Sequence, residues 1–201
     1  MRTLPLLAIL LPCALFAQAP QPSSKLASTP PAQIQSDLNA ALLGNWTGFL
    51  EYRDYSQPDD STERVQLPTW LTIASVPNAA DPNALTEHFI YDDGPTKVVD
   101  ETVHLLFNVT DASYRVTSSS GRTEIYKVAG LDTLTHGRGS LIITGPTIDN
   151  GRPAETRILL TIRRNLIAWT EENRPTATAP YVFRHRYLFT RAQPPNVTAA
   201  L

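Results

Sequence analysis

Cysteine is almost absent from this chain of 201 residues, which contains one, Cys13. Cys13 lies inside an apolar run at the N-terminus, so a chain processed beyond this run has no cysteine and forms no disulfide. Its stability must then come from a packed hydrophobic core. Because secreted eukaryotic barrels usually carry disulfides, their absence favours a bacterial periplasmic or exported protein.

A strong charge of either sign is also lacking. The chain has 17 Lys and Arg residues against 19 Asp and Glu residues, which gives a formal net charge of −2. It has no basic block, so neither nucleic acid nor an anionic membrane surface is an expected partner. No apolar run approaches the about 20 residues that a membrane-spanning helix needs. We therefore predict no integral membrane segment in the mature chain.

Motifs that carry catalytic or cofactor chemistry are missing as well. The sequence has no Gly-x-Ser-x-Gly motif, no phosphate-binding loop and no dinucleotide fingerprint. Its four histidines do not stand at the spacing of a metal-binding pair: His88, His104, His136 and His185. The sequence therefore predicts neither a metal site nor a cofactor.

The first residues have the layout of a secretory signal peptide. Met1 and Arg2 supply a positive start, residues 4–17 are almost wholly apolar, and residues 17–19 offer small side chains for cleavage. A lipoprotein anchored through Cys13 is disfavoured, because a proline precedes that cysteine where a small residue is needed. The expected location is the periplasm or the extracellular space.

The remaining chain divides by composition. Residues 20–31 are rich in Pro, Gln, Ser and Ala and predict a flexible linker after a signal peptide of residues 1–19. Residues 32–192 are long enough for one domain with a core. The Pro- and Ala-rich residues 193–201 predict a disordered tail.

Hydrophobic periodicity in this domain changes once. Apolar residues recur at helical spacing from Ile34 to Leu42, which predicts a short helix that ends at Gly44. From there the period is two, and turn signals separate ten apolar stretches: 45–55, 64–76, 85–92, 96–109, 114–117, 123–128, 141–144, 156–163, 166–171 and 181–191. Such a series indicates an all-β sandwich or barrel, and we predict an antiparallel up-and-down β-barrel of about eight to ten strands.

The start of the first stretch, Gly44-Asn45-Trp46, resembles the Gly-x-Trp signature of lipocalins and related calycin barrels. The resemblance implies that Trp46 lies at the closed end of the barrel beneath a cation from the last strand. Because alternate residues of a strand point to the same face, Arg191 lies on the aromatic face of the last strand and Arg186 on the opposite face, which favours Arg191 for that cation. One face of the last strand carries the aromatic residues, and we expect it to point inward: Tyr181, Phe183, His185, Tyr187, Phe189 and Arg191.

The same alternation of side chains predicts which residues line an interior pocket. If Trp46 points inward, so do Tyr52 and Asp54, and Tyr91 and His185 lie on inward faces of other strands. These four side chains are the predicted ligand-binding residues. For Asp54, a position in a solvated turn at the barrel mouth is the open alternative, and residues 92–95 similarly read as a turn.

Three functions fit this pattern. The first is a secreted or periplasmic barrel that binds a small apolar or amphipathic molecule in its interior. The second is an enzyme of the isomerase, cyclase or lyase kind that uses Tyr52, Asp54 or Tyr91. The third is a filled barrel that serves as a protein-interaction module, with Pro68 and residues 130–139 marking its working edge.

Overall fold

The computed structural model describes residues 29–54, 56–57 and 62–192. The predicted signal peptide, most of the predicted linker and the predicted tail lie outside these residues, as does Cys13. Within the described part of the chain, no helix is long and apolar enough to cross a membrane.

One helix, one short 3₁₀ turn and ten strands make up the described chain. Their bounds are α1 Pro31–Leu42, β1 Gly44–Arg53, β2 Arg64–Ser75, β3 Leu85–Asp92, β4 Val98–Asn108, β5 Ser113–Ser118, β6 Thr123–Ala129, η1 Leu131–Thr133, β7 Gly139–Asp149, β8 Arg152–Arg163, β9 Leu166–Arg174 and β10 Val182–Arg191. Every strand pairs antiparallel with its neighbours in sequence, and β1 also pairs with β10. The predicted up-and-down barrel is confirmed, and it is closed.

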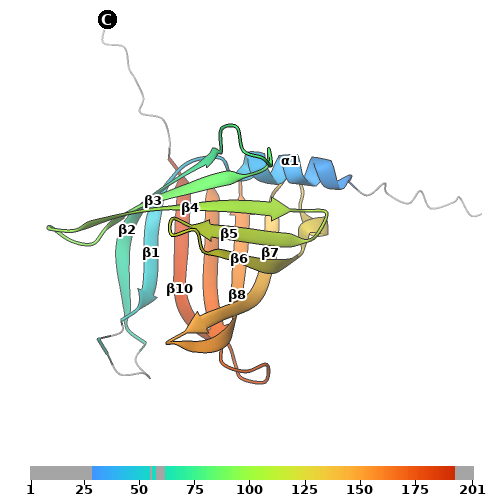
Figure 1. The fold of residues 1–201 in the computed structure, drawn as a ribbon. Helices are drawn as coiled ribbons and strands as arrows, with labels where there is room; N and C mark the ends of the chain where they lie inside the picture. Colours follow the sequence, from blue (N-terminus) through green and yellow to red (C-terminus); the bar gives the residue numbers. More distant parts are fainter. Residues whose placement is uncertain (1–28, 55, 58–61, 193–201) are drawn as a thin grey trace, which may run out of the picture.

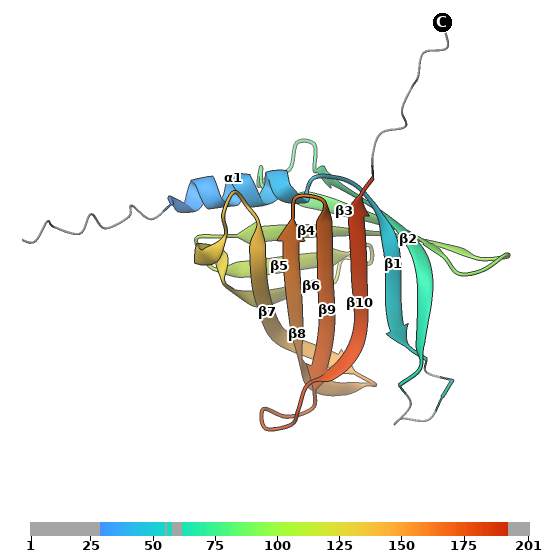
Figure 2. The same cartoon turned by 180° about the vertical axis from the view of Figure 1, so that it is seen from behind.

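Closure follows from the register of β1. Trp46 lies opposite Arg191 of β10 on one side and opposite Leu71 of β2 on the other. A closed antiparallel ring has one inner face, so alternate residues of every strand meet in a common core. In β3 this alternation is regular, with Leu85, Phe89 and other odd-numbered positions buried. Figure 1 and Figure 2 show the ring from opposite sides, with the hairpin of β3 and β4 projecting from it.

Helix α1 covers one end of the barrel (Figure 1). Its inner face buries Leu38, Ala41 and Leu42 in the core that the strands form. Proline at the first helical position suits the start of a helix, because the missing N–H has no partner there in any case. The helix therefore closes the end at which β1 begins and β10 finishes.

Pro68 lies inside β2, where the sequence predicted an edge position, a bulge or a bend. It stands opposite Phe49 of β1, and the ladder between β2 and β3 begins one residue later, at Thr69 and Tyr91. The proline therefore occupies a stretch of β2 that is paired on one side, as an edge position is.

A β-bulge in β10 reverses the side-chain parity near its start. The register with β9 shifts between Phe183 and His185. The inserted residue turns every preceding side chain to the opposite face. The expectation that Tyr181 and Phe183 point inward is therefore wrong: Phe183 lies under the guanidinium of Arg64, 4.7 Å from ring centroid to Cζ.

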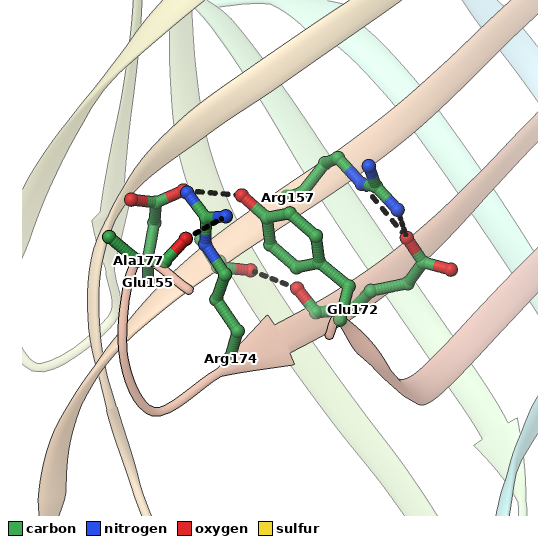
Figure 3. A network of polar contacts seen from close by, with 7 residues as sticks. Glu155, Arg157, Glu172, Arg174 and Ala177 are labelled. Carbon is green, nitrogen blue, oxygen red and sulfur yellow. Dashed lines mark hydrogen bonds and ion pairs between the residues drawn. The ribbon is translucent and has the colours of Figure 1, made fainter. Parts of the chain in front are cut away.

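Tyr181 instead joins a polar network of β8 and β9, because its hydroxyl donates a hydrogen bond to Glu155. Figure 3 labels Glu155, Arg157, Glu172 and Arg174 of this network. Its ring lies between two guanidinium groups, 4.0 Å from Cζ of Arg157 and 4.5 Å from Cζ of Arg174. Arg157 Nε donates a hydrogen bond of 2.9 Å to Glu172, and Arg174 donates one of 2.7 Å to Glu155. The network fixes the connection between β9 and β10 to the barrel wall.

Candidate functional site

The closed end of the barrel is built on Trp46 and Arg191. Trp46 is 1 % exposed, and its indole N–H donates to the carbonyl of Leu42 at 2.9 Å. The guanidinium of Arg191 lies over the indole, 4.1 Å from the ring centroid, in the pairing that parity predicted. It also donates to the carbonyls of Ala41 and Leu43, at 2.9 Å and 2.7 Å. The two side chains thus satisfy three carbonyls at the end of α1 that have no partner inside the helix.

Gly44, the glycine of the Gly-x-Trp motif, is required by this arrangement. Its φ is +129°, a conformation that residues with a side chain rarely adopt. A Cβ at this position would lie 2.6 Å from Nη1 of Arg191. The glycine therefore provides both the turn from helix to strand and the space for the guanidinium.

Beyond this floor the barrel contains a cavity of about 260 Å³. Leu42 of α1 forms part of its wall, and seven aromatic side chains from six strands form much of the rest: Phe89, Tyr91, Phe107, Tyr114, Tyr126, Trp169 and Tyr187. Four of the remaining lining residues are glutamates: Glu87, Glu101, Glu124 and Glu171. No lysine or arginine of the described chain lines it. The site is therefore aromatic and acidic.

Glu87 is the most buried of these acids. The residue is 9 % exposed, and it lies on β3 between the apolar partners Ile73 of β2 and Val103 of β4. Its carboxyl group makes no hydrogen bond or ion pair with any residue that the structure describes. Burial, reinforced by the charge of Glu101, raises the pKa of Glu87 to about 8. At neutral pH this carboxyl is therefore mostly protonated.

Glu171 and His185 face each other across β9 and β10, with 3.6 Å between Oε2 and Nε2. Burial raises the pKa of Glu171, and the hydroxyl of Thr156 partly offsets that effect. Burial lowers the pKa of His185 to about 4, so its imidazole is neutral at pH 7. The pair therefore contributes no positive charge to the cavity.

Phenol groups connect the remaining acids. The hydroxyls of Tyr91 and Tyr187 lie 3.0 Å apart, and Tyr91 also donates to Glu101 at 3.4 Å. Tyr126 donates to Glu124 at 2.8 Å, and Glu124 forms an ion pair with Arg122. Burial raises the pKa of both Tyr91 and Tyr187, so these phenols keep their protons at neutral pH.

The structure divides the four predicted ligand-binding residues. Tyr91 and His185 line the cavity, whereas Tyr52 and Asp54 do not. Asp54 lies just beyond β1 and accepts hydrogen bonds from the backbone N–H and the hydroxyl of Ser56, at 2.9 Å and 2.7 Å. These bonds lower the pKa of Asp54, as expected for a turn residue in water. Tyr52 stands opposite His185 near the end of β1.

The glutamates of the cavity were not among the predicted site residues. A signal for Glu87 exists in the sequence, since it interrupts the apolar face of β3 formed by Leu85, Phe89 and Tyr91. An acid in such a position is costly to bury and so indicates a function. Glu124 likewise shares a face of β6 with Tyr126 and Val128. Glu101 and Glu171 lie on strands with a less regular burial pattern, where alternation alone does not distinguish them.

An ion pair crosses the barrel at the end opposite α1. Arg184, at the bulge of β10, contacts Asp149, at the end of β7, and both side chains are largely buried. Because β8 and β9 separate these strands in the ring, the two side chains meet across the interior. This contact partly covers the end of the barrel away from the floor.

Comparison with known proteins adds no family to this description. No protein-family model matches the chain, and no curated protein matches its sequence. Within the described residues, no group of three or more His, Cys, Asp or Glu side chains has a geometry that could hold a metal ion. The fold and site define a closed ten-strand antiparallel β-barrel with an aromatic, acidic cavity.

Proposed function

We propose that this protein binds a small amphipathic molecule inside its barrel. The observation that carries the proposal is the cavity of about 260 Å³, with aromatic walls and a few inward polar groups. Ligand sites typically combine these two features, and the pockets that hold drug-sized molecules have volumes of about 300–1,000 Å³. The expected ligand is therefore smaller than a typical drug.

A lipocalin-like organisation supports the same proposal. The stacking of Arg191 on Trp46 matches what the Gly-x-Trp resemblance implies for the barrel floor. In such a barrel the floor is permanent and ligands enter from the opposite end. We further propose that the protein acts in the periplasm or outside the cell, an expectation that rests on the sequence of residues 1–19.

Two alternatives have weaker support. A filled barrel would leave no cavity. The proposed working edge at Pro68 is short, because β2 lacks a second partner strand only at residues 64–68 and is paired on both sides from Thr69 onward. An enzyme would retain one of its three proposed residues, Tyr91, in the cavity. Because burial raises the pKa of this phenol, it is a poor base at neutral pH.

A cavity-filling substitution tests the proposal. Ile158 and Leu159 are adjacent on β8, and Ile158 lines the cavity whereas Leu159 is exposed on the outer surface. We expect the mature protein to enhance the fluorescence of the neutral fluorophore N-phenyl-1-naphthylamine. Ile158→Trp should weaken this binding by about tenfold or more, because the larger side chain occupies the ligand's space.

Leu159→Trp is the matched control, since it introduces the same side chain one position away on the outer surface. Its affinity should equal that of the unchanged protein. Equal binding by both variants would place the fluorophore elsewhere. Absence of binding by the unchanged protein, to this fluorophore and to the smaller molecules named below, would refute an open interior site.

A further inference from the structure

We infer that the ligand is an organic cation: an ammonium group on a small aromatic or apolar body, with the ammonium paired to Glu87. The inference rests on the proposed function and names the chemistry of the molecule that the cavity takes. An apolar ligand alone would leave the acids of the cavity without a role.

The charge of the cavity is one-sided. Four glutamates line it, and Arg122 compensates one of them, Glu124. For Glu87, Glu101 and Glu171, the described residues provide no lysine or arginine within ion-pair distance. A ligand with a positive charge would supply a counter-charge to these acids, and to Glu87 once its proton has left, whereas a second carboxylate, such as that of a fatty acid, would add to the negative charge.

Glu87 marks the position of that charge. The residue is 9 % exposed and borders the cavity, and burial and the charge of Glu101, rather than any hydrogen bond, set the pKa of its carboxyl group. A buried polar group without a hydrogen-bond partner destabilises the folded state, and more so if it is charged. Such a group is retained at little cost if a bound ligand satisfies it, and an ammonium donates the hydrogen bonds that a carboxylate accepts.

Aromatic rings surround the same region. Phe89 follows Glu87 on the inner face of β3, and its ring lies 5.5 Å from Tyr187 and 6.0 Å from Trp169. The rings of Trp169 and Tyr187 are themselves 4.5 Å apart. Rings grouped in this way attract an ammonium through their π-faces and also hold an apolar body. The four glutamates do not form a metal site, because the described acids and histidines do not converge on one point.

Proton release supports the inference and provides a second test. Because Glu87 is mostly protonated at neutral pH, a cation must displace its proton on binding. The groups that face this site from the surrounding strands are acids, phenols and one neutral imidazole: Glu87, Tyr91, Glu101, Tyr114, Glu124, Tyr126, Glu171, His185 and Tyr187. Affinity for a cation should therefore rise as the pH rises toward 8.

Three molecules of the same size separate the possible outcomes. We would titrate phenethylamine, phenethyl alcohol and phenylacetate, which are cationic, neutral and anionic, into the mature protein. Binding would be followed by calorimetry and by tryptophan fluorescence, to which Trp169 of the cavity wall contributes. The amine should bind about tenfold or more tightly than the alcohol at about pH 8. Phenylacetate should bind most weakly. Calorimetry of the amine in buffers of different ionisation enthalpy should show release of about one proton at pH 7.

Two variants of the cavity test which glutamate pairs with the ammonium group of the ligand. Glu87→Gln should reduce the ratio of amine to alcohol affinity by about tenfold and abolish the proton release. Glu171→Gln, a second cavity variant, should reduce the ratio by less. Glu51→Gln is the control: Glu51 pairs with Arg186 and does not line the cavity, so its ratio should not change.

The outcomes distinguish this inference from the proposed function. If the alcohol or phenylacetate binds as tightly as the amine, the interior site exists and the cation inference is refuted. If the ratio is unchanged in Glu87→Gln, this residue does not pair with the ligand and the inference is again refuted. If none of the three molecules binds and N-phenyl-1-naphthylamine does not bind, the proposed function itself fails.

Discussion

At the scale of single residues, Arg191 makes the most varied contacts in the closed end. It stacks on Trp46 and donates to two carbonyls of the helix end. A planar guanidinium can do both at once, whereas the ammonium of lysine is a point charge on a flexible stem. The contact is therefore specific for arginine and not merely for positive charge.

Arg191→Lys should for this reason lower the free energy of unfolding by about 1–3 kcal/mol, because hydrogen bonds to charged donors are lost while the carbonyls stay buried. Urea unfolding followed by tryptophan fluorescence measures this change. Arg186→Lys is the control, since Arg186 reaches Glu51 at 3.0 Å on the outer surface. An equal loss in both variants would contradict a special role for Arg191.

At the scale of elements, closure of the ring depends on how closely β1 approaches β10. Gly48 faces Phe189 and Thr69 in the two neighbouring strands. A Cβ at Gly48 would lie 1.9 Å from the carbonyl oxygen of Leu188. Since this obstacle is backbone, no side-chain rotation relieves it. The second glycine of the opening segment thus permits the first and last strands to meet.

Gly48→Ala should accordingly destabilise the barrel by about 1–3 kcal/mol or more, the range of overpacking substitutions. Thermal unfolding followed by circular dichroism tests this prediction. Thr47→Ala, a change at the adjacent exposed position, should have a much smaller effect. A Gly48→Ala protein with unchanged stability would show that β1 and β10 have more space between them.

At the scale of the whole molecule, buried titratable groups make stability depend on pH. The folded state keeps the proton of Glu87 up to about pH 8, whereas the unfolded state releases it near 4.5. Stability therefore falls as the pH rises through this interval. His185 acts oppositely: its pKa falls from 6.5 to about 4 on folding, so stability rises with pH between these values. The two effects oppose each other below pH 6.5.

Above pH 6.5 the effect of Glu87 remains, because its pKa is about 8. We expect the unchanged protein to lose stability from pH 6.5 to pH 8, with a slope of at most about 1.4 kcal/mol per pH unit from this group. Glu87→Gln should flatten this slope. Urea unfolding at several pH values measures it, and an unchanged slope in the variant would contradict the assignment.

Local pattern in the chain determined much of this architecture by itself. The alternation of apolar residues predicted about eight to ten strands, of which the structure has ten. The helical spacing before Gly44 predicted α1, and alternation counted from Trp46 predicted its contact with Arg191. These features depend on nearest neighbours in the sequence and on one rule, that adjacent strand residues point to opposite faces. Tyr91 and His185 were found in the cavity by the same rule.

Tertiary structure alone decided the rest. The bulge of β10 moved Tyr181 and Phe183 outward and let Arg184 reach Asp149, and a single inserted residue leaves no pattern in the sequence. Glu87 and Glu171, which are 84 positions apart in the sequence, share a cavity because ring closure and strand register bring β3 and β9 around one interior. Strand alternation is local, so sequence reveals it. Convergence of charges depends on the closed ring, and only the fold reveals it.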